Sequence, residues 1–306
     1  MRPVIQVERL RKVYGPLVAV DDISFEVHAG EIFGMVGPNG AGKTSTVECV
    51  EGLRPHSSGT LRVLGYNPQK DRYALRAHIG VQLQESALQD RLKVWEALDL
   101  YASFYPRSID QAELLELVGL SEKRNTRFAK LSGGQKQRLF IALALIHDPE
   151  VVFLDELTTG LDPQARRMMW EMVRAMRERG KTVFLITHLM EEAERLCDRV
   201  AIVDHGRLVA LDTPEHLISG LGAESQVIFT VDGSPELEPL RVLPEVRHVQ
   251  QVEDRVILSG NNGSDTLLSS VVQALPTSGI RYRDIRTQRA TLDDVFLQLT
   301  GRAIRD

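Results

Sequence analysis

Hydrophobic residues follow two patterns along this chain, and the two patterns predict different kinds of strand. Residues 23–27 alternate apolar and polar side chains, as on a half-buried antiparallel strand. Residues 32–36 instead form a continuous apolar run, which is typical of a strand buried on both faces. Two more runs of this kind, at 151–154 and 183–186, each follow a stretch of helical periodicity. This alternation of helix and strand predicts an α/β fold with a parallel sheet.

The segment from about residue 85 to residue 150 carries mainly helical patterns. Its three candidate helices cover residues 95–105, 110–118 and 133–147. Because this block falls between strands of the predicted sheet, we expect a helical subdomain inserted into an α/β core.

The last third of the chain predicts a hairpin and then a separate small domain. Two short apolar runs, at 200–203 and 208–211, flank residues 204–207, which indicates a β-hairpin. Residues 212–224 are expected to form a linker with a short helix. We therefore expect two domains, residues 1–220 and a C-terminal α+β domain over residues 221–306. The strand and helix patterns of the second domain lie at 226–231, 246–252, 255–259, 266–275, 282–287 and 292–299.

Composition narrows the class of protein. The 306 residues are 43% hydrophobic and 26% charged, which argues against a disordered chain, a collagen or a coiled-coil rod. Lys and Arg total 37 and Asp and Glu total 42, a net charge of −5, so no general nucleic-acid binding is expected. No apolar run reaches the length of a membrane-spanning helix. The two cysteines, Cys49 and Cys197, lack C-x-x-C spacing and fit a reducing cytoplasm.

A glycine-rich segment follows the apolar run at 32–36 and matches the pattern G-x-x-x-x-G-K-[ST]. Glycines allow the backbone to wrap closely around a phosphate, and the amides at the start of the next helix attract an anion. Lys43 would contact the β- and γ-phosphates of a nucleotide, and Thr44 would bind Mg²⁺. The alternative is a glycine-rich turn without a ligand, against which the flanking strand and helix argue. The candidate phosphate-binding residues are Gly37, Pro38, Asn39, Gly40, Ala41, Gly42, Lys43, Thr44 and Ser45.

Carboxylates and a histidine follow the later buried strands. Asp155 and Glu156 end the second apolar run. In phosphate-loop ATPases an aspartate here holds Mg²⁺, and an adjacent glutamate can activate the attacking water. Ordinary polar residues at a strand end are the alternative, and the upstream phosphate loop favours the functional interpretation. Asp162, which precedes a proline, is expected to cap a helix. His188 lies at the sheet edge where α/β folds bind ligands, although a single histidine is more often structural.

Residues 131–135 have the sequence L-S-G-G-Q and precede a predicted helix. A serine hydroxyl, glycine amides and a helix N-terminus can all donate hydrogen bonds to a phosphate, whereas a simple helix cap is the alternative. With this segment, the phosphate loop and the acidic pair present together, the chain resembles the ATP-binding cassette family, the nucleotide-binding subunits of ABC transporters. The resemblance covers residues 4 to about 220. The signature residues concerned are Ser132, Gly133, Gly134 and Gln135.

The resemblance implies a fold and an assembly. The fold is a P-loop NTPase ATP-binding cassette with an antiparallel β subdomain and an inserted helical subdomain. Two cassettes pack head to tail, and each ATP lies between the phosphate loop of one cassette and the signature segment of the other. The second cassette is either another copy of this chain or a paralogue. The implied cofactors are ATP and Mg²⁺.

The resemblance also implies roles for single residues. Glu156 corresponds to the catalytic base, His188 to the histidine that senses the γ-phosphate, and Asp162 to the aspartate that signals across the dimer interface. Tyr14 resembles the aromatic residue that stacks on adenine, with a surface aromatic as its alternative. The family usually has a proline where this chain has Leu157, so the loop loses rigidity without losing a ligand.

Gln84 resembles the glutamine that joins the core to the helical subdomain and reaches Mg²⁺ or water. Gln82 lies two residues away and is the other candidate for this position.

Three segments indicate the kind of transporter. Residues 187–194, 198–212 and 291–301 are similar to a branch that pairs with separate membrane subunits and exports drugs, antibiotics, lipids or polysaccharides. The implied partner is an integral membrane permease on another chain, which places this protein at the cytoplasmic face of the cell membrane. A soluble cassette of translation or repair and an inactive regulatory cassette are the alternatives. The closing segment also fits an ordinary amphipathic helix.

Overall fold

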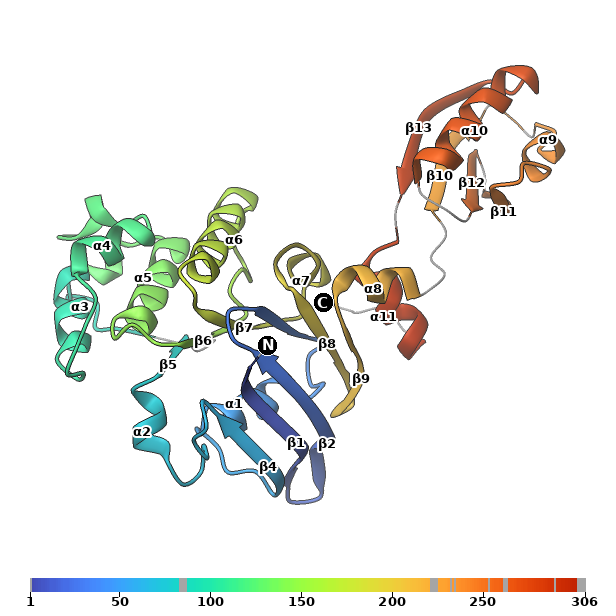
Figure 1. The fold of residues 1–306 in the computed structure, drawn as a ribbon. Coiled ribbons are helices and arrows are strands. Elements are labelled where there is room, and N and C mark those ends of the chain that lie inside the picture. Colours follow the sequence, from blue (N-terminus) through green and yellow to red (C-terminus); the bar gives the residue numbers. More distant parts are fainter. Residues whose placement is uncertain are drawn as a thin grey trace. The chain divides into compact units, whose positions relative to one another are not determined.

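The computed structural model describes residues 2–82, 87–220, 225–231, 233, 235–252, 254–260, 264–288 and 290–301. Contacts divide the chain into two compact units, Met1–Pro214 and Glu215–Ala303 (Figure 1). No helix among these residues is long and apolar enough to cross a membrane.

A three-stranded antiparallel sheet begins the first unit. Its strands are β1 (Pro3–Tyr14), β2 (Leu17–His28) and β4 (Ser58–Val63), in the order β2-β1-β4. Buried and exposed residues alternate along much of β1 and β2, because one face of the sheet packs against the core.

A six-stranded sheet forms the centre of the first unit, in the order β5-β6-β7-β3-β8-β9. The first five of these are parallel, and β9 runs antiparallel to β8. The carboxyl ends of β3, β6 and β7 therefore lie at one edge, where α/β sheets bind ligands. The strands are β3 (Ile32–Val36), β5 (Ile79–Gln82), β6 (Val151–Asp155), β7 (Thr182–Thr187), β8 (Arg199–Asp204) and β9 (Arg207–Asp212).

The two sheets share one hydrophobic core. Phe25 of β2 stacks on Phe33 of β3 with ring centroids 5.3 Å apart, and Phe184 of β7 lies 5.2 Å from Phe33. Aromatic contacts of this kind stabilise a core beyond the area that they bury. The core thus fixes β3 and β7, the strands that lead into the phosphate loop and His188.

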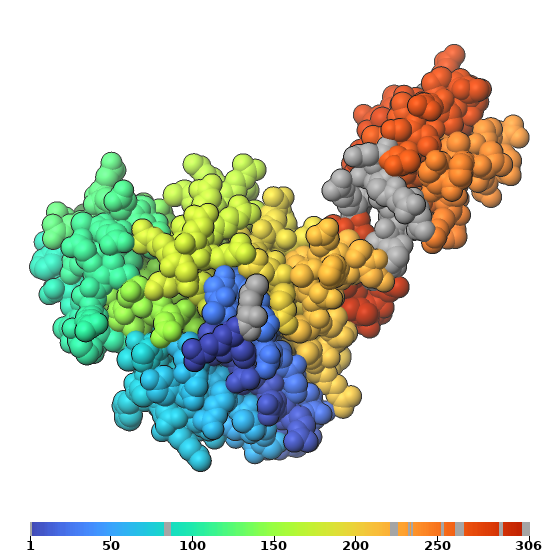
Figure 2. All heavy atoms as spheres, viewed as in Figure 1, coloured from blue at the N-terminus to red at the C-terminus, as the bar shows by residue number. Residues whose placement is uncertain are grey.

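The predicted helical block lies between β5 and β6 and is confirmed. In the space-filling view its green residues lie to one side of the blue residues of the antiparallel sheet (Figure 2). The helix expected at 95–105 ends at Ala102. The helices of the first unit, including two short 3₁₀ turns, are α1 (Lys43–Val50), α2 (Arg72–Arg76), α3 (Val94–Ala102), α4 (Gln111–Leu117), η1 (Ser121–Lys123), η2 (Phe128–Lys130), α5 (Gly133–Leu145), α6 (Pro163–Glu178) and α7 (Met190–Leu196).

The predicted hairpin near residue 205 is confirmed as β8 and β9. His205 and Gly206 form its turn and have positive φ values of 47° and 73°. A two-residue turn with both φ values positive matches the twist of the flanking strands, which favours glycine at the second position.

The second unit is an antiparallel sheet in the order β11-β12-β10-β13. Apolar residues of α10, including Leu267 and Val271, pack with Phe229 of β10 and Leu258 of β12 in a core of its own. The elements are α8 (Pro214–Gly220), β10 (Ser225–Val231), α9 (Glu238–Arg241), β11 (Val246–Val252), β12 (Arg255–Gly260), α10 (Ser264–Thr277), β13 (Tyr282–Gln288) and α11 (Leu292–Thr300).

Candidate nucleotide-binding site

The phosphate loop connects β3 to α1 and turns through several left-handed glycines. Gly37, Gly40 and Gly42 have φ values of 152°, 80° and 99°. A Cβ atom on Gly37 would lie 2.1 Å from the Val203 carbonyl oxygen, so a side chain has no room there. The Ala41 amide donates to the Pro38 carbonyl at 3.1 Å, which tightens the turn. The glycines therefore serve both the backbone conformation and the close packing of the loop on β8.

Lys43 is the first residue of α1 and is only 5% exposed. Its Nζ donates to the carbonyl oxygens of Gly37 at 2.7 Å and Pro38 at 3.0 Å. Burial lowers the pKa of Lys43, and the negative charges of Glu156 and Asp155 oppose that shift. An ammonium held under the loop in this way is placed to gain from a phosphate above it.

The first turn of α1 carries two predicted residues, Thr44 and Ser45. Thr44 is exposed there, and Asn39 is exposed in the preceding loop. The Ser45 hydroxyl lies 3.4 Å from the Tyr14 hydroxyl of β1, which brings the predicted adenine-stacking ring to the end of the phosphate loop. The Lys12 Nζ lies 4.6 Å from the centre of this ring, a cation–π contact.

Asp155 and Glu156 lie at the carboxyl end of β6, separated from β3 by β7. Burial and the neighbouring charge of Glu156 raise the pKa of Asp155 to about 6, and Lys43 opposes the shift. The structure thus gathers a buried ammonium and two carboxylates at one edge of the sheet. Neighbouring groups with perturbed pKa values are common at functional sites.

Glu156 and His188 form a pair. The Glu156 Oε1 atom lies 3.3 Å from the His188 Nδ1 atom, and both side chains are 15% exposed. The Glu156 amide donates to the Ile186 carbonyl at 2.9 Å, and the Gln137 side chain of α5 donates to the Glu156 carbonyl at 3.4 Å. Backbone and side chain of Glu156 are therefore both held in place.

Glu156 has a φ of 49°, in the left-handed region that a residue with a side chain rarely adopts. A proline at the next position would restrict this residue to extended conformations, whereas leucine does not. The side chain of Leu157 is completely buried. Packing of Leu157, rather than a proline ring, thus anchors the loop, which gives a physical account of this departure from the family pattern.

The signature segment lies at the N-terminus of α5, where Ser132 is the N-cap. The Gln135 amide donates to the Ser132 Oγ at 3.3 Å, and the Ser132 amide donates to the Gln135 Oε1 at 3.0 Å. This reciprocal capping leaves the exposed Ser132 hydroxyl proton available to an acceptor. A Cβ atom on Gly133 would meet nothing within 4 Å, whereas one on Gly134 would contact Leu161 at 3.6 Å.

Asp162 caps α6, as the sequence predicts. Its carboxylate accepts hydrogen bonds from the Gln164 amide at 3.0 Å and the Ala165 amide at 2.9 Å, and Pro163 begins the helix. Gln84 lies outside the described residues. The alternative candidate, Gln82, is buried at the carboxyl end of β5 beside Leu154.

Glu192 of α7 is a residue that the sequence interpretation did not single out. It is 1% exposed, and the Trp170 indole of α6 donates to its carboxylate at 3.3 Å. Burial raises its pKa, while the hydroxyls of Thr187 and Thr158 oppose that shift. The carboxylate thus lies among the segments that carry Glu156 and His188. Apolar residues at positions 189 and 196, three before and four after it, are the sequence signal that it is buried.

Comparison with known proteins identifies the family. A profile of the ABC transporter family matches residues 20–159. The linearmycin resistance ATP-binding protein of Bacillus subtilis is 37% identical over 312 residues, which cover 99% of this chain and 100% of that protein. The chain belongs to the ATP-binding subunits of ABC transporters.

Two further relatives agree with this family. The Nod factor export ATP-binding protein I of Paraburkholderia xenovorans is 40% identical to this ATP-binding subunit over 313 residues, 99% of this chain and 98% of that protein. A solved structure described as the ATP binding subunit of an ABC transporter is 28% identical with a TM-score of 0.65, and the match covers 72% of this chain and 93% of that one. The predicted cassette fold and the predicted family are confirmed.

Asp155 makes the stability of the ATP-binding subunit depend on pH. A carboxyl pKa raised from 3.8 to about 6 stabilises the folded state below pH 3.8, and this contribution is lost as the pH rises through 6. Asp155→Asn should therefore increase the free energy of unfolding without nucleotide at pH 8. The expected gain is about 1–2 kcal/mol, because solvent screening reduces the value of about 3 kcal/mol that the pKa implies.

Urea unfolding at pH 8 and at pH 4.5 measures this effect. The gain should be less than about half as large at pH 4.5, because the Asp155 carboxyl is then protonated in the folded state and partly protonated in the unfolded chain. Asp99→Asn, an exposed substitution in α3, is the matched control and should change the free energy of unfolding at neither pH. A gain of equal size at both pH values would contradict the assignment.

Proposed function

We propose that this ATP-binding subunit hydrolyses ATP and thereby powers export through a separate membrane subunit. The observation that carries the proposal is the pair formed by Glu156 and His188, held at the same sheet edge as Lys43 and Asp155. A carboxylate that is both held and partly exposed suits a general base, which must reach a water molecule in a fixed direction.

The chain's own residues divide the work of phosphoryl transfer. The amides of the phosphate loop and the Lys43 ammonium bind the phosphates. The left-handed glycines allow the loop to wrap around an anion, and the buried Lys43 supplies a positive charge. Glu156 accepts the proton of the attacking water, and His188 orients the Glu156 carboxylate. An anion bound beside Lys43 also stabilises the charged form of the lysine, which burial disfavours and whose pKa burial lowers.

We propose Mg²⁺ as the second cofactor, bound by the Thr44 hydroxyl, the Asp155 carboxylate and Gln84. Thr44 is exposed at the first turn of α1, and Asp155 has a carboxylate that burial makes costly to ionise without a cation. No group of three or more acidic, histidine or cysteine residues that could hold a metal occurs in the described part of the chain. That fits Mg²⁺, which needs few protein ligands because nucleotide phosphates and water supply the rest. Bound there, the ion neutralises charge that develops on the phosphates.

We further propose that two cassettes share each ATP. Among the described residues, no hydrogen bond or ion pair joins the signature residues of α5 to the phosphate loop. The exposed Ser132 hydroxyl is therefore free to meet the nucleotide of a second cassette, a copy of this chain or a paralogue. In the same dimer Asp162 lies at the interface and Tyr14 stacks on adenine.

The proposed direction is export, and the proposed substrate is a drug, an antibiotic or a lipid. The relatives' names, linearmycin resistance and Nod factor export, support this class. The integral membrane permease then holds the subunit at the cytoplasmic face. In this proposal residues 1–220 form the cassette and residues 221–306 form a C-terminal accessory domain. A lipid or polysaccharide exporter, or a soluble cassette ATPase, is the alternative.

Affinity purification from native membranes tests the proposal. The tagged full-length chain should co-purify with one integral membrane protein in stoichiometric amount, and the complex should hydrolyse ATP only with Mg²⁺. Recovery of ribosomes or DNA in place of a membrane protein would overturn the transporter part. Absence of ATPase activity in an intact complex would overturn the enzymatic part.

A further inference from the structure

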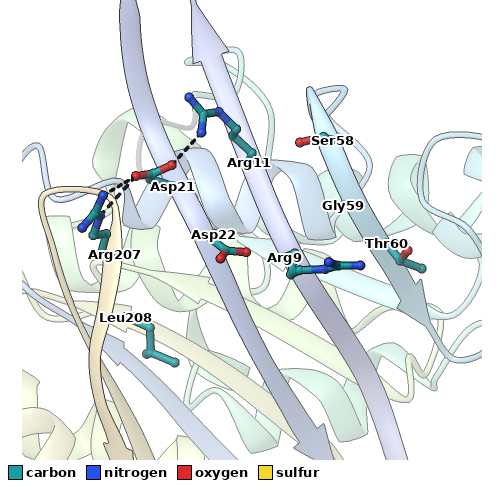
Figure 3. A pocket seen from close by; sticks show the side chains of 9 residues that line it. All are labelled: Arg9, Arg11, Asp21, Asp22, Ser58, Gly59, Thr60, Arg207 and Leu208. Atoms are coloured by element: carbon teal, nitrogen blue, oxygen red, sulfur yellow. Dashed lines mark hydrogen bonds and ion pairs between the residues drawn. The ribbon is translucent and has the colours of Figure 1, made fainter.

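A cavity of about 840 Å³ opens on the outer face of the antiparallel sheet, away from the core (Figure 3). Three arginines line it: Arg9 and Arg11 from β1, and Arg207 from the start of β9. The hydroxyls of Ser58 and Thr60 line it from β4, the neighbour of β1 on the side away from Arg207. Guanidinium groups and hydroxyls are the donors that recognise oxyanions.

Asp21 of β2 holds two of these arginines. Its carboxylate accepts hydrogen bonds from the Arg207 Nη2 at 2.8 Å and the Arg11 Nη1 at 2.9 Å (Figure 3). The Arg207 hydrogen bond is the largest cause of the lowered pKa of Asp21. Each guanidinium has five N–H donors, so both retain donors for a ligand while Asp21 fixes their directions. The cavity is therefore organised before any ligand arrives.

The backbone around the cavity is unusual on three neighbouring strands. Arg9, Asp22 and Gly59 have positive φ values of 47°, 60° and 104°. The register of β1 shifts against both neighbours at this level, which marks β-bulges. A Cβ atom on Gly59 would lie 2.5 Å from the Arg9 carbonyl oxygen, so the close approach of β4 requires glycine. Bulges of this kind redirect side chains, here toward a common cavity.

The cavity is linked to the phosphate loop through two backbone hydrogen bonds. The Asp21 amide donates to the Gly206 carbonyl at 2.7 Å, and the Gly206 amide donates to the Ala41 carbonyl at 2.9 Å. Gly206 directly precedes Arg207, so the hairpin turn between β8 and β9 connects Arg207 to the phosphate loop. These two hydrogen bonds are the route by which an anion at Arg207 and Asp21 would affect the support behind the phosphate loop.

We propose that this cavity binds a small multivalent oxyanion, with phosphate or carboxylate groups, and that its occupancy is coupled to nucleotide binding. Three arginines face two carboxylates, Asp21 and Asp22, so the lining carries a net positive charge. No aromatic residue lines the cavity, which disfavours a nucleoside base as the ligand. Asp22 forms no hydrogen bond or ion pair with the three arginines and acts as a like charge toward the anion.

Calorimetric titration of the full-length protein tests the site. Pyrophosphate and citrate are titrated separately at constant ionic strength, without metal, into protein saturated with ADP so that the phosphate loop is filled. Binding by pyrophosphate alone assigns a phosphate ligand, binding by citrate alone assigns a carboxylate ligand, and binding by both assigns the shared oxyanion chemistry. Absence of saturable binding by either would overturn the proposal. Because ADP needs only to bind, the result does not depend on ATP hydrolysis.

Two substitutions with opposite expected signs make the test sharp. Arg9→Gln should weaken anion binding by about tenfold or more, since a charge-assisted hydrogen bond is lost. Asp22→Asn should tighten it, and asparagine tolerates the left-handed backbone at this position. Arg62→Gln, an exposed substitution on β4 outside the cavity, is the matched control and should have no effect. Equal losses in Arg9→Gln and Arg62→Gln would show nonspecific attraction and overturn the site.

The coupling between the anion site and the nucleotide site is tested by measuring the dissociation constants of both ligands. The anion should change the dissociation constant of ATP, and saturation with ATP should change that of the anion by the same factor. Arg9→Gln should reduce both changes at the anion concentration that just saturates wild type, because a site about tenfold weaker is then only partly filled. An ATP dissociation constant that is unaffected by a saturating anion would overturn the coupling.

Discussion

Replacing Glu156 with glutamine is expected to reduce ATP turnover by at least about a hundredfold while ATP still binds. A general base in place contributes about 10²–10⁴ to a rate, and an amide cannot accept the water proton. Glutamine has nearly the same size and can still contact His188 at the present 3.3 Å position. Phosphate release at saturating Mg²⁺ and ATP measures turnover, and calorimetry measures the dissociation constant of ATP.

The same variant should accumulate as an ATP-bound dimer, because hydrolysis is the step that separates the two cassettes in the proposed cycle. Size-exclusion chromatography with ATP and Mg²⁺ detects this species. Glu171→Gln, an exposed substitution in α6, is the matched control and should retain wild-type turnover. Near-normal turnover in Glu156→Gln would refute the role assigned to Glu156.

The parts of the site that lie next to one another in sequence could be predicted without a structure. The phosphate loop and the acidic pair each follow a buried strand, and parallel strands bring their carboxyl ends to one edge. The cap at Asp162 was predicted, and the cap at Ser132 was the alternative interpretation of the signature segment; both are present, because each residue stands in the required place before a helix. In all these cases local sequence decides the geometry.

The sequence interpretation missed the short buried elements β5 and α7. It also missed elements with few buried positions. Strand β4 buries only Leu61 and Val63, and the short helices α2 and α9 each bury a single residue. Such elements have too little apolar periodicity to be distinguished from loops. Strand β4 forms because it pairs with β1, a contact between distant residues that no local pattern records.

The conformation at Glu156 could not be predicted either. Its left-handed φ depends on the hydrogen bond from its amide to Ile186 and on the burial of Leu157, both of which arise from tertiary packing. The sequence showed only that a leucine replaces the usual proline. The structure adds that this leucine is compatible with a backbone conformation that proline would disfavour at the preceding residue.

Lys43→Ala is the second substitution with a large expected effect, and it should raise the dissociation constant of ATP by about a hundredfold. Charge-assisted hydrogen bonds contribute about 1.5–3 kcal/mol each, and the buried ammonium is placed to serve two phosphates. Lys43→Arg should not restore binding, because a planar guanidinium does not fit a pocket in which Nζ lies 2.7 Å from the Gly37 carbonyl. Calorimetry with Mg²⁺ and ATP at pH 7.5 measures both variants.

Lys70→Ala, an exposed substitution, is the matched control and should bind ATP as wild type does. A dissociation constant for Lys43→Ala within about threefold of the wild-type value would contradict the role of Lys43, since that difference is well below one charge-assisted hydrogen bond. Comparison with Glu156→Gln separates the two functions of the site. Lys43→Ala should lose affinity for ATP, because Lys43 binds the phosphates. Glu156→Gln should lose only turnover, because Glu156 acts on the attacking water.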